Sequence, residues 1–157
     1  MNMNNCNDIF LFDDGQVFFP RLRKILSLKP STRGANRILQ LRQTTARVLF
    51  VILKAGYNEY VTDDNILHEV WDKHGLSSSS QALYRSVNMI NKKFTELSGK
   101  KDRVCIKRVY RHGYRIEDVK RLSDCHFCAL FLNDVDKKRH ENGSLKTCHS
   151  ASSACPR

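Results

Sequence analysis

The strongest constraint on the fold is the spacing of apolar residues between Ser80 and Gly99. They recur at intervals of four, three, four and three residues, at Leu83, Val87, Ile90, Phe94 and Leu97. On a helical wheel they fall within about 40° of one line, which is typical of a helix with one buried face. Burying each side chain contributes about 1.5–3 kcal/mol before conformational entropy is counted. The sequence therefore predicts a long amphipathic helix, capped by Ser79 or Ser80 and ending near Gly99.

The opposite side of this predicted helix is polar, with Gln81, Arg85, Asn88 and Lys92 along it. Arginine bonds the edge of guanine in the major groove of DNA, and asparagine or glutamine bonds adenine. We therefore expect Gln81, Arg85 and Asn88 to contact bases, with Tyr84 beside them. An ordinary solvated helix face is the alternative, which these residues alone do not exclude.

Short apolar runs separated by turn residues come before this helix and predict a small antiparallel sheet. The expected strands cover residues 9–12, 17–19, 25–28 and 37–41. Asp13-Asp14-Gly15 supplies a tight turn between the first two strands, because glycine readily adopts positive φ. The N-terminal part of the chain is therefore expected to be a sheet.

Two shorter helices are predicted between the sheet and the long helix. The first is capped by Thr44 or Thr45 and ends at Gly56. The second begins at Thr62 and closes at Gly75. Two acidic residues directly follow Thr62, which suits the positive end of a helix dipole.

A basic hairpin is predicted directly after the long helix. Residues 104–110 alternate loosely as a strand, residues 111–113 form a tight turn, and residues 114–116 are the return strand. The order of elements is therefore sheet, helix, helix, long helix and hairpin, an α+β arrangement.

Positive charge is concentrated in two blocks of the chain. The protein has 157 residues, with 27 Lys+Arg against 16 Asp+Glu, for a formal net charge of +11. Residues 21–47 hold eight bases and no acid, and residues 85–115 hold ten bases and two acids. This charge favours a polyanionic partner, either nucleic acid or an anionic membrane. The second block overlaps the long helix and the hairpin, whereas the first either flanks DNA or simply faces water.

Other function classes are less favoured by the sequence. No apolar stretch approaches the roughly 20 residues of a membrane-spanning helix, and the N-terminus lacks the pattern of a signal peptide. No phosphate-binding loop, HExxH or GxSxG motif is present, so we expect neither an enzyme nor a cofactor. RNA-binding modules present exposed aromatic residues on a sheet, and no such platform is evident.

Three short motifs occur in the order found in one family of DNA-binding domains. Val70-Trp71 ends the second helix, 90–94 reads Ile-Asn-Lys-Lys-Phe near the end of the long helix, and Gly113-Tyr114-Arg115 lies in the hairpin. Residues 41–116 thereby resemble the winged-helix DNA-binding domain of the OmpR/PhoB type, and the nearest branch is the ToxR/CadC-like transcriptional regulators of bacteria. Including the strands, the resemblance covers about residues 9–117. Asn91 stands where the family usually has Arg, and Arg108 and Arg111 stand where Thr and Gly are common.

The resemblance implies a winged helix-turn-helix with an N-terminal antiparallel sheet, three helices and a C-terminal β-hairpin wing. Residues 9–119 would form this domain, after a disordered segment 1–8 and before a poorly ordered, cysteine-containing tail 120–157. The long helix would lie in the major groove and the wing near the minor groove. The implied protein is a sequence-specific, cytoplasmic, nucleoid-associated transcriptional regulator that binds double-stranded DNA. A winged helix for protein interaction, or a non-specific architectural DNA-binding module, is the alternative.

Phosphate contacts are expected from the helix starts, the long helix and the wing. The candidates are Thr62, Ser80, Lys92, Lys93, Lys107, Arg108, Arg111 and Arg115. Arg111 at the wing tip is also placed to enter the minor groove. Arg115 has a second interpretation as a brace within the hairpin, and Tyr114 is expected to be a core residue.

The remaining expectations concern partners and the tail. Because no membrane span is predicted, we expect either a soluble, stand-alone regulator or one whose signal comes from a separate sensor or membrane protein. Family members suggest dimers on tandem sites. Four tail residues, Cys125, Cys128, Cys148 and His149, have roughly the spacing of a zinc site. Cys148 and His149, however, do not have the CxxC or HxxxH spacing of a second pair of zinc ligands, so a metal-free tail is favoured.

Overall fold

A computed structural model describes residues 8–29, 37–56, 58–101 and 103–123. Residues 1–7 of the expected N-terminal segment and the tail from 124 onward lie outside the described residues, and so do the four zinc candidates. Within the described ranges, no helix is long and apolar enough to cross a membrane.

Five strands form one antiparallel sheet at the N-terminal side of the molecule. They are β1 (Asp8–Phe12), β2 (Gln16–Phe19), β3 (Lys24–Ser27), β4 (Ile38–Gln40) and β7 (Val119–Ser123), in the order β4-β3-β2-β1-β7. The Asp13-Asp14-Gly15 turn joins β1 to β2 as predicted, with Gly15 at φ 78° and its N–H bonded to the Phe12 carbonyl at 2.8 Å. The four predicted strands are therefore present, and no strand end differs from its predicted position by more than one residue.

Strand β7 is absent from the sequence prediction, which places residues 120–123 in the tail. The structure pairs β7 with β1, from Asp8 opposite Ser123 to Phe12 opposite Val119. The exposed Lys120 and Arg121 give this segment the composition of a solvated tail. Pairing with β1 is a contact between the two ends of the domain, and local patterning does not report such contacts.

The three helices are α1 (Gln43–Ala55), α2 (Asp63–Val70) and α3 (Ser80–Ser98). The predicted cap of α1 was wrong: the helix begins at Gln43, its N-cap is Arg42, and no side chain caps it. Thr45 is instead inside the helix and only 8% exposed. The Thr62 cap of α2 is confirmed, since its hydroxyl accepts the Asn65 N–H at 3.3 Å.

The ends of the next two elements follow from their caps. Helix α2 stops at Val70, earlier than predicted, and a short 3-10 helix η2 (Asp72–His74) leads to the left-handed Gly75. Helix α3 is capped by Ser79, whose hydroxyl accepts the Ala82 N–H at 3.1 Å. Ser80 is therefore the first helical residue of α3, and the left-handed Gly99 follows its last one.

The core lies between the sheet and the helices, as the stripe on α3 predicts. Leu83, Val87, Ile90 and Phe94 are all buried on α3. Phe94 meets Phe12 of β1 edge to face, with ring centroids 4.7 Å apart. Burial of the apolar face therefore fixes which side of α3 remains outside.

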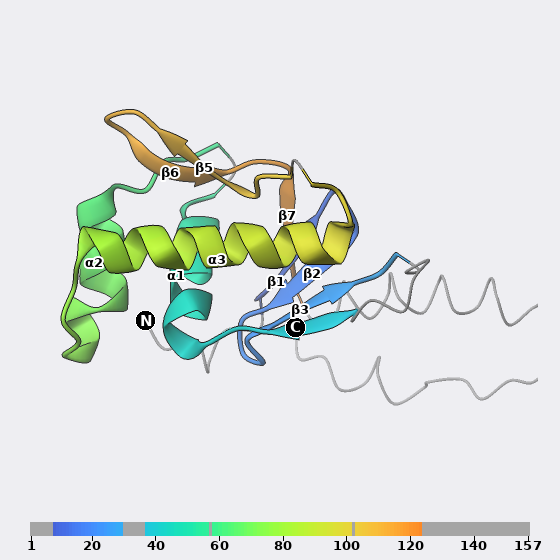
Figure 1. The fold of residues 1–157 in the computed structure, drawn as a ribbon, viewed down its shortest axis with the longest axis horizontal. Coiled ribbons are helices and arrows are strands. Elements are labelled where there is room, and N and C mark those ends of the chain that lie inside the picture. The colour runs from blue at the N-terminus through green and yellow to red at the C-terminus, as the bar shows by residue number, and fades with distance from the viewer. Residues whose placement is uncertain (1–7, 30–36, 57, 102, 124–157) are drawn as a thin grey trace, which may run out of the picture.

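The hairpin consists of β5 (Ile106–Val109), which is shorter than predicted, and β6 (Gly113–Ile116), which begins one residue earlier than predicted. Figure 1 shows α3 running across the molecule, with this hairpin along one side and the sheet near the C-terminal end of the helix. The architecture is thus α+β, with an N-terminal antiparallel sheet, three helices and a C-terminal hairpin, as the winged-helix resemblance implied.

Candidate nucleic-acid interface

The outer face of α3 is open to solvent in its first half. Gln81, Tyr84, Arg85 and Asn88, hereafter the α3 strip, are all exposed, and Tyr84 is 59% exposed. Residues 80–92 contain no acidic side chain. All four residues predicted to contact bases therefore lie on a surface that a ligand can reach.

Asn91 joins α3 to the wing. Its side-chain amide donates to the Ile106 carbonyl at 3.1 Å, and its amide oxygen accepts the Ile106 N–H at 2.8 Å. Farther along α3, the Thr95 hydroxyl donates to the Arg103 carbonyl at 3.1 Å. The Asn91 amide therefore bonds both backbone groups of the first residue of β5.

We expect Asn91→Ala to lower the free energy of unfolding by about 1–3 kcal/mol, because it removes the hydrogen-bonding partners of a partly buried N–H and C=O. Asn88→Ala is the matched control on the exposed side of the same helix and should change stability by less than about 0.5 kcal/mol. Urea unfolding of both variants measures the difference. Equal stabilities would show that the bond to the wing contributes nothing.

Two of the predicted phosphate contacts have no ion-pairing partner in the described part of the chain. Lys92 extends from the exposed side of α3, and Arg111 is at the tip of the wing. The Arg111 backbone is left-handed, with φ 62°, and its guanidinium lies 5.2 Å from the centre of the Tyr110 ring. Tyr110 is 80% exposed, so the wing tip presents an aromatic ring and a cation together.

The other basic candidates of the wing pair with carboxylates of the protein. Lys107 and Arg115 both contact Glu117, and Arg115 also donates to the Tyr60 hydroxyl at 3.0 Å. The hydrogen bond from Lys107 and the nearby Arg115 hold the pKa of Glu117 below its usual value. These pairs support the interpretation of Arg115 as a brace within the hairpin.

Arg108 connects the wing to the start of α2. Its guanidinium lies 2.9 Å from the Asp63 carboxylate and donates to the Tyr114 hydroxyl at 2.7 Å. Hydrogen bonds to these two groups raise the pKa of Arg108 above its usual value. Thr62 is exposed beside this pair, so a phosphate at the start of α2 would compete with Asp63 for Arg108.

The two remaining phosphate candidates lie on α3 itself. Ser80 is exposed in the first turn of the helix. Lys93 is half-buried on α3, 3.4 Å from Glu96. Of the eight candidates, therefore, the structure leaves Lys92 and Arg111 most available.

A basic hollow beside α3 has no counterpart among the sequence predictions. It measures about 470 Å³ and is lined by Gln40, Leu41, Arg42, Thr45, Arg85, Ser86, Met89 and Lys93. We call it the α1–α3 hollow, because Arg42 and Thr45 at the start of α1 and four residues of α3 line it. The only feature of the sequence that hints at this hollow is the segment 21–47, which has eight basic residues and no acidic one. That segment does not distinguish Arg42 from the other seven basic residues.

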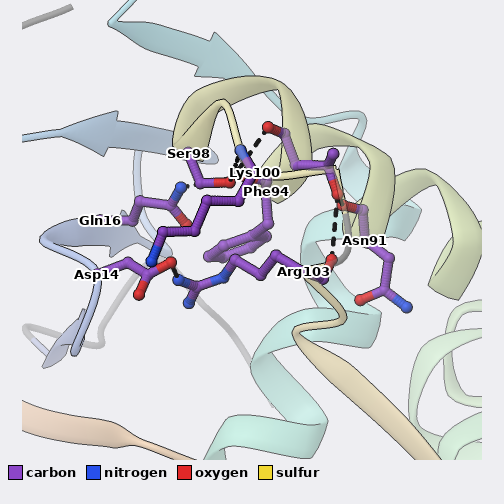
Figure 2. A network of polar contacts seen from close by, with 8 residues as sticks. Asp14, Gln16, Asn91, Phe94, Ser98, Lys100 and Arg103 are labelled. Carbon is purple, nitrogen blue, oxygen red and sulfur yellow. Dashed lines mark hydrogen bonds and ion pairs between the residues drawn. The ribbon is translucent and has the colours of Figure 1, made fainter.

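A second polar cluster links the sheet to the far end of α3 (Figure 2). Gln16 of β2 is buried and donates to the Phe94 carbonyl at 3.0 Å. Arg103 forms an ion pair with Asp14 and lies 5.8 Å from the centre of the Phe94 ring. This cluster holds the C-terminal half of α3 on the sheet, so it positions the helix from behind.

The described residues include no group of three or more potential metal ligands. Cys105 is buried, and loss of hydration raises the pKa of its thiol to about 12. The thiol is therefore neutral at physiological pH and acts as a small core residue.

Comparisons with known proteins support the fold. No family model matches the chain, and a search of curated proteins gives no match. Among solved structures, the chain is similar to the DNA-binding domain of E. coli CadC, with a TM-score of 0.56 and 16% sequence identity. The match covers 73% of this chain and 95% of that domain. At this identity the likeness establishes a winged-helix fold.

Proposed function

We propose that this chain is a sequence-specific DNA-binding regulator of transcription, with α3 in the major groove and the wing at the adjacent minor groove. The observation that carries the proposal is the α3 strip. Gln81, Arg85 and Asn88 are side chains that discriminate base edges, and they are exposed together on a helix whose other face is buried. DNA binding by the similar CadC domain agrees with this assignment.

The surroundings of α3 suit a helix that must enter a groove in one orientation. A helix with its side chains is about 10–12 Å across, close to the width of about 12 Å of the major groove. Asn91 attaches one side of α3 to the wing, and Gln16 attaches its C-terminal half to the sheet. A helix held in this way presents the α3 strip without ordering itself first, which lowers the entropic cost of binding.

In this proposal Lys92 and Arg111 make the main phosphate contacts, and Arg111 at the wing tip also enters the minor groove. Four further basic residues add to the positive electrostatic potential of this surface while their ion pairs hold the wing and α3 in place. They are Lys93, Lys107, Arg108 and Arg115. Thr62 and Ser80 add polar contacts at two helix starts. Such contacts set orientation and affinity, whereas the α3 strip sets sequence preference.

The wider setting rests on the sequence resemblance. We place the chain among OmpR/PhoB-type bacterial regulators of the ToxR/CadC-like branch, acting in the cytoplasm on the nucleoid. A separate sensor or membrane protein would carry the signal, and two copies would occupy tandem sites. We expect the protein to need neither a catalytic centre nor a cofactor for this role.

Selection from a random pool of DNA duplexes tests sequence specificity, and Arg85→Ala tests the base-reading role. The variant should bind the selected site about 5–150-fold more weakly, equivalent to about 1–3 kcal/mol, with little change on random DNA. Lys92→Ala is the contrasting variant: it should weaken binding to both duplexes similarly and reduce the salt slope by about one. Fluorescence anisotropy over a range of salt concentrations measures both effects.

The outcomes separate the proposal from its alternatives. An equal loss on selected and random DNA would remove Arg85 from base recognition. Salt-sensitive binding without any enriched sequence would indicate a non-specific architectural protein. No binding to any duplex would favour a winged helix that serves protein interaction.

A further inference from the structure

The α1–α3 hollow is basic and has no carboxylate in its lining. Its cations are Arg42 from the start of α1 and Arg85 and Lys93 from α3. Among the described residues, Arg42 and Arg85 have no ion pair, whereas Lys93 is 3.4 Å from Glu96. Because Arg85 is assigned to base contacts, Arg42 is the uncompensated guanidinium that is left to attract an anion to this concave surface.

Thr45 gives this hollow a polar group without a partner. The residue is 8% exposed and lines the hollow, and its hydroxyl makes no hydrogen bond within the described ranges. The hydroxyl oxygen is not among the buried side-chain atoms that lack a partner, so it is accessible from the hollow and can donate to an acceptor there. The first turn of α1 also has no acidic residue and no side-chain cap, so its N–H groups remain available.

The position of the hollow relates it to the proposed DNA-binding surface. Arg85 belongs both to its lining and to the α3 strip. Figure 1 shows the hairpin on one side of α3 and the beginning of α1 on the other. A duplex that places a major groove on the α3 strip therefore brings the flanking sugar–phosphate backbone toward the hollow, on the side away from the wing.

We propose that the α1–α3 hollow binds a DNA backbone phosphate, with Arg42 as its principal cation and the Thr45 hydroxyl as a second donor. This inference rests on the proposed function and adds a contact to it. The wing and the hollow then hold the two backbones that border the groove, and α3 lies between them. Neither Arg42 nor Thr45 reads sequence, so the contact fixes how deeply and at what angle α3 enters.

Arg42→Ala tests the site. Its affinity is measured for two duplexes, one selected by the wild-type protein and one of random sequence. Arg42 makes no side-chain cap, so the variant should fold normally. We expect affinity for both duplexes to fall about 5–10-fold and the salt slope to decrease by about one. Arg37→Ala is the matched control, from the same basic block but outside the lining, and should leave affinity and slope nearly unchanged.

Ethylation interference locates the phosphate itself. In the wild-type protein, ethylating one backbone phosphate beside the bound groove should block binding, and Arg42→Ala should lose sensitivity at that position alone. Thr45→Val removes only the hydroxyl, so it should weaken binding without changing the salt slope. An interference pattern and slope identical to wild type in Arg42→Ala would overturn the site while leaving DNA binding established.

Two other outcomes also decide the question. If the wild-type protein binds no duplex, the proposed function fails, and the inference fails with it. If inorganic phosphate binds the hollow of the DNA-free protein and DNA does not displace it, the hollow is a small-anion site and the inference is wrong.

Discussion

Replacing Gly113 with alanine is expected to lower the free energy of unfolding by about 3 kcal/mol or more. Gly113 begins β6 with φ 106°, a conformation that side chains with a Cβ rarely adopt. A Cβ there would also lie 2.1 Å from the Val61 carbonyl oxygen and 2.9 Å from the Thr62 Cα. Both obstacles are backbone atoms, so no side-chain movement relieves them.

The contact that this substitution breaks is the attachment of the wing to the segment before α2. Val61 and Tyr114 exchange two backbone hydrogen bonds, each 2.9 Å long. Tyr114 is also 2% exposed, so displacing it opens the core. We therefore expect loss of stability and loss of wing geometry to occur together in this variant.

Gly99→Ala is the matched control, since Gly99 has φ 66° but a Cβ added there would meet no atom within 4 Å. It should cost only the strain of a left-handed residue, about 1–2 kcal/mol. Urea unfolding followed by the fluorescence of Trp71, the single tryptophan, measures both variants. A cost for Gly113→Ala no larger than that for Gly99→Ala would mean that the wing does not pack closely against Val61.

Phe94→Ala is expected to destabilise the protein by about 3–5 kcal/mol, the usual cost of emptying a buried aromatic site. Phe94 is fully buried and contacts the Phe12 ring of β1 and the Arg103 guanidinium. Its loss leaves a cavity between α3 and the sheet, at the point where the sheet supports the helix. We expect DNA affinity to fall as well, because α3 loses its support.

Two further variants isolate this effect. Phe94→Leu keeps most of the buried volume and should cost less than Phe94→Ala. Met89→Ala removes an exposed side chain from the same helix and should change stability by about 0.5 kcal/mol or less. A cost below about 1 kcal/mol for Phe94→Ala would show that α3 does not depend on the sheet.

Elements governed by local periodicity and caps could be predicted from the sequence. The limits of α3 follow from the spacing of its apolar residues, from Ser79 before it and from Gly99 after it. Thr62 was recognisable because a capping hydroxyl and two acids stand together there. The exposed position of the α3 strip could then be predicted as well, because burial of the apolar side of α3 leaves the opposite side of the helix exposed.

Features that depend on distant parts of the chain could not be predicted. Strand β7 exists because β1 accepts a second neighbour more than 100 residues away, and Lys120 and Arg121 give it the composition of a tail. The pairing of Arg108 with Asp63 joins residues 45 positions apart. Composition counts Arg108 as a free positive charge, whereas the fold neutralises it locally.

The pairing of β1 with β7 also determines how the domain would respond to force. Asp8 and Ser123 face each other at the same end of two antiparallel strands. A pull applied at these two residues loads their hydrogen bonds one after another, as in opening a zipper, instead of shearing them all at once. The sheet would therefore open from this edge, and β7 would separate from β1 before tension reached α3 or the wing.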